Sequence, residues 1–394
     1  MPNEINHILV VGAGIAGCSA AIAFRQLGKK VTIIEKSPEI QFNSSGIFIY
    51  SNGLYQFNKL GVLKALLAAG FIIENDENQY FTETGLAIVN TYYPRINRDI
   101  PGILGIKRAQ LHHILLQRMQ ELGVTLNLGV TVKTLMEDTQ NNTVHVSFNQ
   151  EDNKEFDLVI GADGIRSQMR SWINPDIQPH YTGFGVWRSV HARPHHLTTK
   201  IMQMGMGKRV GVLPINPEQM YMFGTIVDHQ NTWKPRDQWH NLMKQAFSDF
   251  TGGEVVNLFK QLNSQSEILY TAVEEIRMPL PWNKGRTIVI GDAAHASTPF
   301  MGQGGAMAVQ DACELAEMLQ YAECHDHPLD LVQLLQKFSE KRFAMCKFVQ
   351  DISRAVGENG ATETSQDCLM RNQYMQLNAQ TKVDDFYKKL LSFT

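Results

Sequence analysis

The sequence has few cysteines and no pairing pattern among them. The chain of 394 residues contains five, none in a Cys-x-x-Cys pair: Cys18, Cys313, Cys324, Cys346 and Cys368. An odd number at such wide spacing disfavours a disulfide framework, a zinc ribbon and a dithiol redox centre. We therefore expect a protein of a reducing compartment, with a cytoplasmic location and no bound metal.

Charge of one sign and long apolar runs are also scarce. Lys and Arg number 36 and Asp and Glu 39, for a formal net charge of −3, whereas a nucleic-acid-binding domain normally carries a basic face. The uncharged run at residues 8–24 is near the lower length limit of a membrane span, but it contains three glycines and no basic region precedes it. We expect neither a nucleic-acid partner nor an integral membrane segment.

A glycine-rich turn lies between the first predicted strand, residues 7–11, and the first predicted helix, residues 15–27. In a Gly-x-Gly-x-x-Gly turn the glycines permit a tight bend, close approach of a pyrophosphate and close packing of helix on strand. The free N–H groups of the helix attract phosphate. A carboxylate ends the second predicted strand, residues 30–34, where it can bind ribose hydroxyls. The predicted dinucleotide contacts are Gly12, Ala13, Gly14, Ile15, Ala16, Gly17, Glu35 and Lys36.

Two further glycine motifs follow predicted strands. An Asp-Gly pair, Asp163 and Gly164, follows strand 158–160, and a Gly-Asp pair, Gly291 and Asp292, follows strand 287–290. Strand ends are where α/β folds place their ligands. With the three motifs in this order, the chain resembles the class A flavoprotein monooxygenases, the p-hydroxybenzoate hydroxylase-like family, over most of its length.

The resemblance implies FAD as the cofactor and assigns roles to residues outside the first turn. It implies that Asp292 bonds the ribityl chain and that the glycine-rich helix start after Pro299 faces the pyrimidine edge of the flavin. Asp163 would lie near the pyrophosphate, and the alternative for this residue is a role in a turn and as a helix cap. The alternative for Arg108 is an ordinary surface position. The further FAD-contacting residues implied are Ser45, Gly46, Ile47, Arg108, Val132, Asp163, Asp292, Pro299, Gly302, Gln303, Gly304 and Gly305.

The chain lacks a second strand-linked dinucleotide motif, because residues 205–207 supply only two glycines and no helix context. This absence disfavours enzymes with two dinucleotide folds and fits class A enzymes, where NADH or NADPH visits as a co-substrate. The resemblance implies capture of O2 as a flavin C4a-hydroperoxide and hydroxylation of a small aromatic or heteroaromatic compound. The protein must then exclude water and hold an electron-rich ring close to the flavin.

Candidate substrate residues lie in the region of alternating strands. Arg209 and Tyr221 resemble an arginine and a tyrosine at the substrate of urate hydroxylases; both could equally be ordinary sheet residues. Trp187 and Arg188 form a second candidate pair. An arginine can stabilise an anionic substrate, and a tyrosine can orient or deprotonate it. Phe300 is expected to wall the ring site.

Four histidines are candidates for catalysis or metal binding. His295 follows the third glycine motif, and we expect it to be packed in a turn rather than to act as a base. His191, His195 and His196 lie in a polar connection with Pro194, which predicts a solvated loop rather than a metal site.

These patterns predict an α/β fold: a Rossmann-like FAD-binding domain, an inserted, mostly antiparallel substrate sheet and a C-terminal helix. The predicted FAD-binding domain is discontinuous, the substrate domain is inserted between its parts, and a helical segment ends the chain. The ranges are 1–72, 101–176 and 277–350 for the first, 73–100 and 177–276 for the second and 351–394 for the third. We expect a monomer or a homodimer.

Two other functions remain open from the sequence. The same family includes flavin monooxygenases that inactivate tetracycline-type antibiotics and carry a C-terminal helix, as this chain does. A non-catalytic flavin-binding sensor would share the cofactor motifs but would not turn over.

Overall fold

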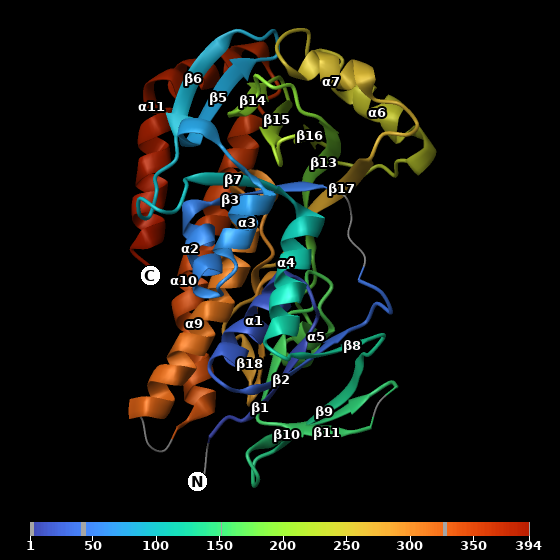
Figure 1. Ribbon diagram of the computed structural model, residues 1–394. Coiled ribbons are helices and arrows are strands. Elements are labelled where there is room, and N and C mark those ends of the chain that lie inside the picture. Colours follow the sequence, from blue (N-terminus) through green and yellow to red (C-terminus); the bar gives the residue numbers. More distant parts are fainter. Residues whose placement is uncertain (1–3, 41–44, 151, 326–328, 394) are drawn as a thin grey trace.

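The computed structural model describes residues 4–40, 45–150, 152–325 and 329–393. It has a mixed α/β fold in which one sheet lies near the N-terminus and another lies beneath helices α6 and α7 (Figure 1). Two long helices, α10 (Leu331–Gly360) and α11 (Ser365–Leu391), follow one side of the molecule. No helix among the described residues is both long enough and apolar enough to cross a bilayer.

A six-stranded sheet carries the three glycine motifs. Its order is β18-β19-β12-β1-β2-β8, and the strands are β1 (His7–Val11), β2 (Lys30–Glu35), β8 (Thr125–Leu128), β12 (Leu158–Gly161), β18 (Asn283–Lys284) and β19 (Thr287–Val289). All pairings are parallel except that of β18 with β19. Val11 pairs with Gly161, and Gly161 pairs with Val289. The three strands that precede the glycine motifs are therefore neighbours and end at the same edge.

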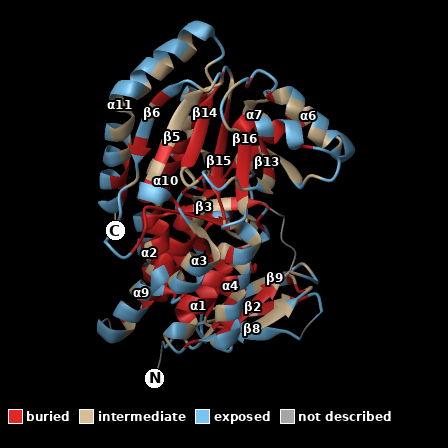
Figure 2. Cartoon of the chain, turned by 45° about the horizontal axis from the view of Figure 1, so that its top comes forward, coloured by how far each residue is buried: buried red, intermediate tan, exposed pale blue. Residues whose placement is uncertain are grey.

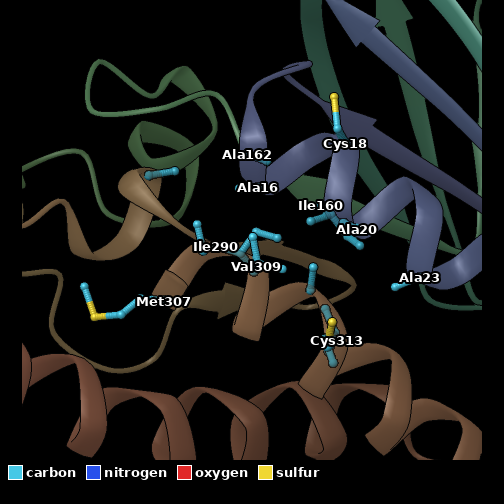
Figure 3. Close-up of a cluster of buried hydrophobic side chains, with 14 of the residues drawn as sticks. Ala16, Cys18, Ala20, Ala23, Ile160, Ala162, Ile290, Met307, Val309 and Cys313 are labelled. Carbon is cyan, nitrogen blue, oxygen red and sulfur yellow. The ribbon is translucent and has the colours of Figure 1, made fainter. Parts of the chain in front are cut away.

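Small side chains allow the helices behind this edge to approach closely. Helix α1 (Ile15–Gln26) packs against α9 (Gly304–His325). Figure 3 shows alanines of α1, with Ile160 of β12 and Ile290 just after β19, gathered beside Val309 and Cys313 of α9. A Cβ atom on Gly291 would lie 2.9 Å from that of Ala16. This packing brings the N-terminal ends of both helices to the edge where the strands end.

The apolar periodicity of residues 52–67 predicts one amphipathic helix, but the structure divides this stretch into two helices. Helix α2 (Ser51–Lys59) ends before Gly61, and α3 (Leu63–Ala69) begins after it. Gly61 has a φ of 76°, in the left-handed region that favours glycine, and its N–H donates to the Asn58 carbonyl at 2.9 Å. The chain therefore turns where apolar periodicity alone predicted a straight helix.

A seven-stranded sheet occupies the other half of the molecule. Its order is β17-β13-β16-β15-β14-β5-β6, and the strands are β5 (Glu77–Thr82), β6 (Ala87–Tyr92), β13 (His180–Ala192), β14 (Lys200–Met204), β15 (Lys208–Pro214), β16 (Gln219–Val227) and β17 (Ile268–Glu275). One face packs on α6 (Trp239–Ala246) and α7 (Val255–Gln261). The central strands are buried, whereas α11 is largely exposed (Figure 2).

Two three-stranded sheets and several short elements complete the fold. The first, β3 (Gly46–Tyr50), β7 (Ile103–Lys107) and β4 (Phe71–Ile72), contacts β15 and β16 through β7 and β3. The second consists of β9 (Val132–Asp138), β10 (Thr143–Phe148) and β11 (Lys154–Phe156). The remaining helices used below are α4 (Arg108–Glu121), α5 (Gln168–Ile173), α8 (Asp292–His295) and the 3-10 helix Pro299–Met301.

Candidate active site

A cleft of about 320 Å³ opens where the three glycine motifs meet. It lies between the N-terminal ends of α1, α4, α8 and α9. Its lining residues are Gly14, Ile15, Ala16, Arg108, Ala109, His112, Ala162, Gly164, Asp292, Gly304, Gly305 and Ala308. Most of them are small, so backbone N–H groups and helix ends form much of the surface. Such a surface suits an elongated ligand with phosphate groups.

The first glycine turn is held by backbone contacts and by Glu35. Gly12 has a φ of 101°, and a Cβ atom there would lie 2.6 Å from the carbonyl oxygen of Ala162. A Cβ on Gly14, in contrast, would meet no atom of the described residues within 4 Å. The Glu35 carboxylate accepts a hydrogen bond from the Ala13 N–H at 3.0 Å. It therefore braces the turn, while Lys36 is exposed and is absent from the cleft lining.

Helix α4 contributes two side chains to the opposite wall. Arg108 is its exposed first residue, and its backbone N–H donates to the Ser45 carbonyl at 2.8 Å. His112 lies one turn further along, with Nε2 2.5 Å from the carbonyl oxygen of Ala13. Burial lowers the pKa of His112 below its usual value. His112 was not predicted from the sequence; its spacing of four from Arg108 is the signal that places both on one helix face.

The third motif presents a carboxylate and a helix end to the cleft. Asp292 is exposed at the start of α8, and its side chain has no hydrogen-bond partner among the described residues. Gly304 and Gly305 open α9, and a Cβ on Gly305 would lie 3.6 Å from Ile47. The Asp292 carboxylate can accept hydrogen bonds from hydroxyls of a ligand, and the start of α9 can face a ligand's electron-rich edge.

Gln303 has a different environment from its glycine neighbours. Its side chain is buried; its Oε1 accepts from Asn52 Nδ2 at 2.8 Å, and its Nε2 donates to the Tyr387 hydroxyl at 3.3 Å. The preceding Gly302 is left-handed, with a φ of 64°, and it closes the 3-10 helix that begins at Pro299. The Gln303 side chain thus fixes the start of α9 to α2 and α11.

The other predicted cofactor positions differ in how closely they approach the cleft. Ile47 lies with Ile15, Gly302 and Gly305 around a small adjoining hollow. Val132 is buried at the start of β9, where its carbonyl accepts from Gln168 Nε2 at 3.2 Å. Val132 is not among the residues that line the cleft.

Asp163 serves mainly as a cap in this structure. Its carboxylate accepts from the Ser167 hydroxyl at 2.5 Å and from the backbone N–H groups of Gln168 and Met169 at 2.7 and 3.0 Å. Burial raises the pKa of Asp163, and these hydrogen bonds oppose the rise. The turn and cap role is therefore the one that its contacts support, while the adjacent Ala162 and Gly164 line the cleft.

His295 is engaged in a buried ion cluster. Its Nε2 lies 2.6 Å from Asp311 Oδ2, and the other oxygen of Asp311 accepts from Arg342 Nε at 2.6 Å. Burial opposes the charge on His295, but Asp311 raises the pKa of the imidazole well above its usual value. Asp311 also accepts from the Gly291 N–H at 2.8 Å. Through Asp311 the cluster thus holds the third motif in place. His295 is buried and engaged by Asp311, so it is not available as an exposed base.

The other histidines lie apart from the cleft. His195 and His196 are exposed, and His196 Nε2 lies 2.9 Å from a carboxylate oxygen of Glu254. The prediction of a solvated loop was wrong for His191, which lies in β13 with its Nε2 2.8 Å from the Ser189 hydroxyl. In the described part of the chain, the three are not close enough together to bind one metal ion.

Arg209 and Tyr221 share one face of the seven-stranded sheet. In β15 and β16 the pairs Arg209–Thr225 and Leu213–Tyr221 lie on the side that faces β3, whereas Val210 and Met220 pack under α6 and α7. Trp187 packs with Val210 and Met220 in the buried cluster under α6 and α7. Trp187 and Arg188 therefore point to opposite faces of β13. Only Arg188 of this candidate pair shares the face of Tyr221.

The environments of the two candidates differ in polarity. The Arg209 guanidinium lies 4.8 Å from the centre of the Phe300 ring, its Nε has no hydrogen-bond partner among the described residues, and burial lowers its pKa to about 10. Tyr221 is buried against Gly46, and burial raises the pKa of its hydroxyl. A substrate anion beside Arg209 would supply the missing acceptor.

Known proteins match this chain over nearly its whole length. The FAD binding domain family matches residues 6–349. The 2-heptyl-3-hydroxy-4(1H)-quinolone synthase of Pseudomonas aeruginosa is 29% identical over 94% of each chain. The FAD-dependent urate hydroxylase of Mycolicibacterium vanbaalenii is 29% identical over 85% of this chain and 84% of its own.

A solved structure shares the fold. HpxO from Klebsiella pneumoniae, complexed with FAD and uric acid, superposes with a TM-score of 0.85 and 22% identity, covering 98% of this chain and 97% of its own. The cleft fits FAD, because it is lined by an open glycine, the N-terminal ends of four helices and a carboxylate without a partner among the described residues. The chain belongs to the FAD binding domain family, and its cofactor is FAD.

Proposed function

We propose that this protein is an FAD-dependent monooxygenase that hydroxylates a small aromatic or heteroaromatic compound, with NADH or NADPH as reductant and O2 as co-substrate. The main support for the proposal is that two spaces adjoin each other in the structure. The cleft formed by the three glycine motifs meets, across β3, a buried face that combines aromatic rings with a cation.

Residues that line the cleft would hold the FAD cofactor. The turn around Gly14 and the N-terminus of α1 would bind the pyrophosphate, and Asp292 would accept hydrogen bonds from the ribityl hydroxyls. Arg108 is placed to neutralise phosphate charge, and the start of α9 at Gly304 faces the space for the flavin ring. Bound FAD, reduced by the nicotinamide, supplies the chemistry that activates O2 for transfer of one oxygen atom to the substrate.

The protein's own contribution is to bind and orient the ring in an apolar space. Phe48 and Phe223 lie 5.9 Å apart between ring centres, and Tyr221 and Phe223 lie 5.6 Å apart. These rings, with Phe300, exclude water from the substrate and hold it flat. Arg209 would stabilise negative charge on the substrate, which makes the ring more electron-rich and more readily hydroxylated.

We also propose a division of the chain into domains. We assign residues 1–72, 101–176 and 277–350 to a Rossmann-like FAD-binding domain and residues 73–100 and 177–276 to the substrate domain. In support, β5 and β6 from the first insertion pair into one sheet with β13–β17 from the second. Residues 351–394 would form a C-terminal helical segment that contacts β6.

Two ring systems named for similar proteins guide the choice of substrate. One relative is a synthase of a hydroxyquinolone, and a neighbouring structure contains uric acid. Both compounds are fused nitrogen heterocycles with oxygen substituents on the ring, and these oxygens can carry negative charge. We propose a substrate of this kind, and tetracycline-type inactivation stays as the alternative.

The test is a substrate screen on the purified holoprotein. Oxidation of NADH and NADPH would be followed with a panel of phenols, heteroaromatic acids, quinolones and tetracyclines, and product masses would be measured. We expect stimulated oxidation and a product heavier by one oxygen atom. A flavin that no nicotinamide reduces, or that O2 does not reoxidise, would instead indicate a sensor and overturn the proposal.

A further inference from the structure

A lysine that the sequence analysis did not consider lies in the same buried face as Arg209. Lys200 begins β14, is 4% exposed, and its Nζ lies 3.2 Å from the hydroxyl of Tyr50. Its neighbour Ile201 packs in the cluster under α6 and α7, whereas Met202 lies on the same face as Lys200. The amine is therefore directed away from solvent, toward β3.

Aromatic rings surround this amine. Its Nζ lies 4.6 Å from the centre of the Phe48 ring, 5.4 Å from that of Tyr93 and 5.6 Å from that of Tyr50. The Tyr50 and Tyr93 rings stack at 4.6 Å, and Tyr387 of α11 lies 6.0 Å from each. We call Phe48, Tyr50, Tyr93 and Tyr387 the aromatic cage. The cage holds the cation, but it supplies no negative charge.

In the part of the chain that the structure describes, no carboxylate compensates the two buried cations. Among the described residues neither Lys200 nor Arg209 forms an ion pair, although many surface lysines and arginines do, such as Lys208 with Asp249. Burial, reinforced by the charge of Arg209, lowers the pKa of Lys200 to about 7. Two uncompensated cations in an apolar space are costly, and an anion between them would remove that cost.

Other buried polar groups lie near Lys200. Asn78 pairs with Lys200 in the register of β5 and β14, and Thr91 pairs with Asn78 in β6. The side-chain amide of Asn78 and the hydroxyl of Thr91 are buried next to the hydroxyl of Tyr80, with which both interact, whereas Nε of Arg209 is buried without a hydrogen-bond partner in the described part of the chain. Buried polar groups are normally satisfied, so Nε of Arg209 points to a ligand with an acceptor atom.

The aromatic cage adjoins the space for the flavin. A Cβ on Gly302 would lie 2.0 Å from a ring carbon of Phe48, and Phe48 lines the small hollow together with Gly302 and Gly305. A substrate lying over Phe48 could therefore reach both the flavin side and the amine of Lys200. The lysine is in a position to fix the orientation of the ring.

We propose that Lys200 is a second anion-binding residue of the substrate site, which binds an anionic oxygen of the ring substrate together with Arg209. The inference rests on the proposed function and narrows the class of substrate: the substrate carries a carboxylate or an ionised ring hydroxyl. Lys200 acts in binding and positioning, while Arg209 holds the charge from the neighbouring strand.

The experiment compares matched anionic and neutral probes on the FAD-loaded protein, with binding followed by the change in flavin absorbance. Benzoate and benzamide test for a carboxylate, and 4-nitrophenol and 4-nitroanisole test for an ionised hydroxyl. We expect the wild type to prefer the anionic member of at least one pair. Its bound 4-nitrophenol, if that pair is preferred, should show the absorption spectrum of the phenolate.

Three variants assign that preference to the lysine. Lys200→Met keeps the length of the side chain but removes its charge, and we expect the preferred anion to bind ~10-fold more weakly with the neutral probe unchanged. Lys200→Arg should retain most of the preference. Lys208→Met is the matched control, because Lys208 precedes Arg209 on the opposite face and bonds the Ala246 carbonyl at 2.8 Å.

The outcomes separate this inference from the proposed function. A wild type without preference for either anion, or a Lys200→Met protein that retains FAD and the wild-type preference, would overturn the role of Lys200. If Lys200→Met fails to fold, the wild-type probe preference and the Lys200→Arg variant still decide. Failure of the monooxygenase proposal would appear differently, as the absence of an oxygen-containing product in the substrate screen.

Discussion

Tyr221 lies so close to Gly46 that a Cβ atom added to Gly46 would stand 2.3 Å from the Cβ of Tyr221. Gly46 begins β3 of a three-stranded sheet, and Tyr221 belongs to β16 of the seven-stranded sheet. The contact between these two sheets is thus made where one of the two residues has no side chain. The distance between the two sheets depends on this glycine.

A Gly46→Ala substitution should therefore push Tyr221 out of place. Overpacking of this kind costs about 1–3 kcal/mol of folding stability, and we expect a lower melting temperature together with a higher KM for the ring substrate. Thermal unfolding and steady-state kinetics would measure both. Unchanged values for melting temperature and KM would contradict the close packing described here.

Gly14→Ala should have the opposite pattern. A Cβ at Gly14 meets no described atom within 4 Å, and its φ of −76° is accessible to alanine, so the stability of the FAD-free protein should be unchanged. The methyl group would, however, occupy space needed by the pyrophosphate, and FAD affinity should fall at least ~10-fold. Titration of the FAD-free protein would measure this. Gly12→Ala is the contrast, because its Cβ would strike Ala162 and destabilise the free protein as well.

Asp292→Ala should weaken FAD binding without unfolding the protein. The carboxylate has no protein partner to lose among the described residues, and a hydrogen bond to a charged group contributes about 1.5–3 kcal/mol, or ~10- to 100-fold in affinity. FAD content after purification and titration would report the loss. Asp330→Ala removes the N-cap of α10 outside the cleft and should leave FAD affinity intact. Full flavin content in Asp292→Ala would refute the assignment.

Asp311→Ala should be strongly destabilising. It would leave the buried charges of His295 and Arg342 without their partner, a change that costs about 3–5 kcal/mol. Denaturant unfolding would measure it. Since His295 and Arg342 lower the pKa of Asp311 to about 2 despite its burial, the wild type should lose this stabilisation as the pH falls from about 4 toward 2. A wild type and a variant with equal stability near neutral pH would argue against the ion cluster.

Anion binding at Lys200 should depend on pH near neutrality. Benzoate is ionised throughout this range, and with a pKa of about 7 Lys200 is a cation only below that pH, so affinity should fall as the pH rises through 7, by up to ~10-fold per unit. The other groups facing the site change little: burial raises the pKa of the hydroxyls of Tyr50, Tyr80, Tyr93 and Tyr387, and Arg209, at about 10, stays charged.

In Lys200→Met the affinity for benzoate should be lower and flat over the same pH range. A wild-type profile that is equally flat would show that Lys200 does not titrate at the ligand. Lys208→Met should retain the wild-type profile, because its side chain leaves the sheet on the other face.

The cofactor site was largely predictable because its requirements are local. A turn such as that at Gly12 must have glycine, and an apolar run before Gly161 or Gly291 predicts a strand that ends at or just before that glycine. The parallel register then places the motifs together without further information. The break at Gly61 was not foreseen, because apolar periodicity continues across it although the backbone does not.

The substrate face was much less predictable, because it depends on pairing between distant strands. Lys200 looks like an ordinary polar residue at a strand start, and only the register of β14 with β5 buries it beside Asn78. Trp187 and Arg188 are adjacent in sequence, yet the sheet separates their side chains. Tyr387 enters the site from a helix far along the chain, where local sequence carries no sign of that contact.

The strand order of the first sheet has a consequence for how the protein is made. Strands β19, β12 and β1 lie side by side in this order, but all seven strands of the other sheet come between β1 and β19 in sequence. A nascent chain emerging from the ribosome therefore has its pyrophosphate turn long before it has Asp292. We expect FAD to be captured only after synthesis has passed α9, and the slow joining of these distant strands to limit folding.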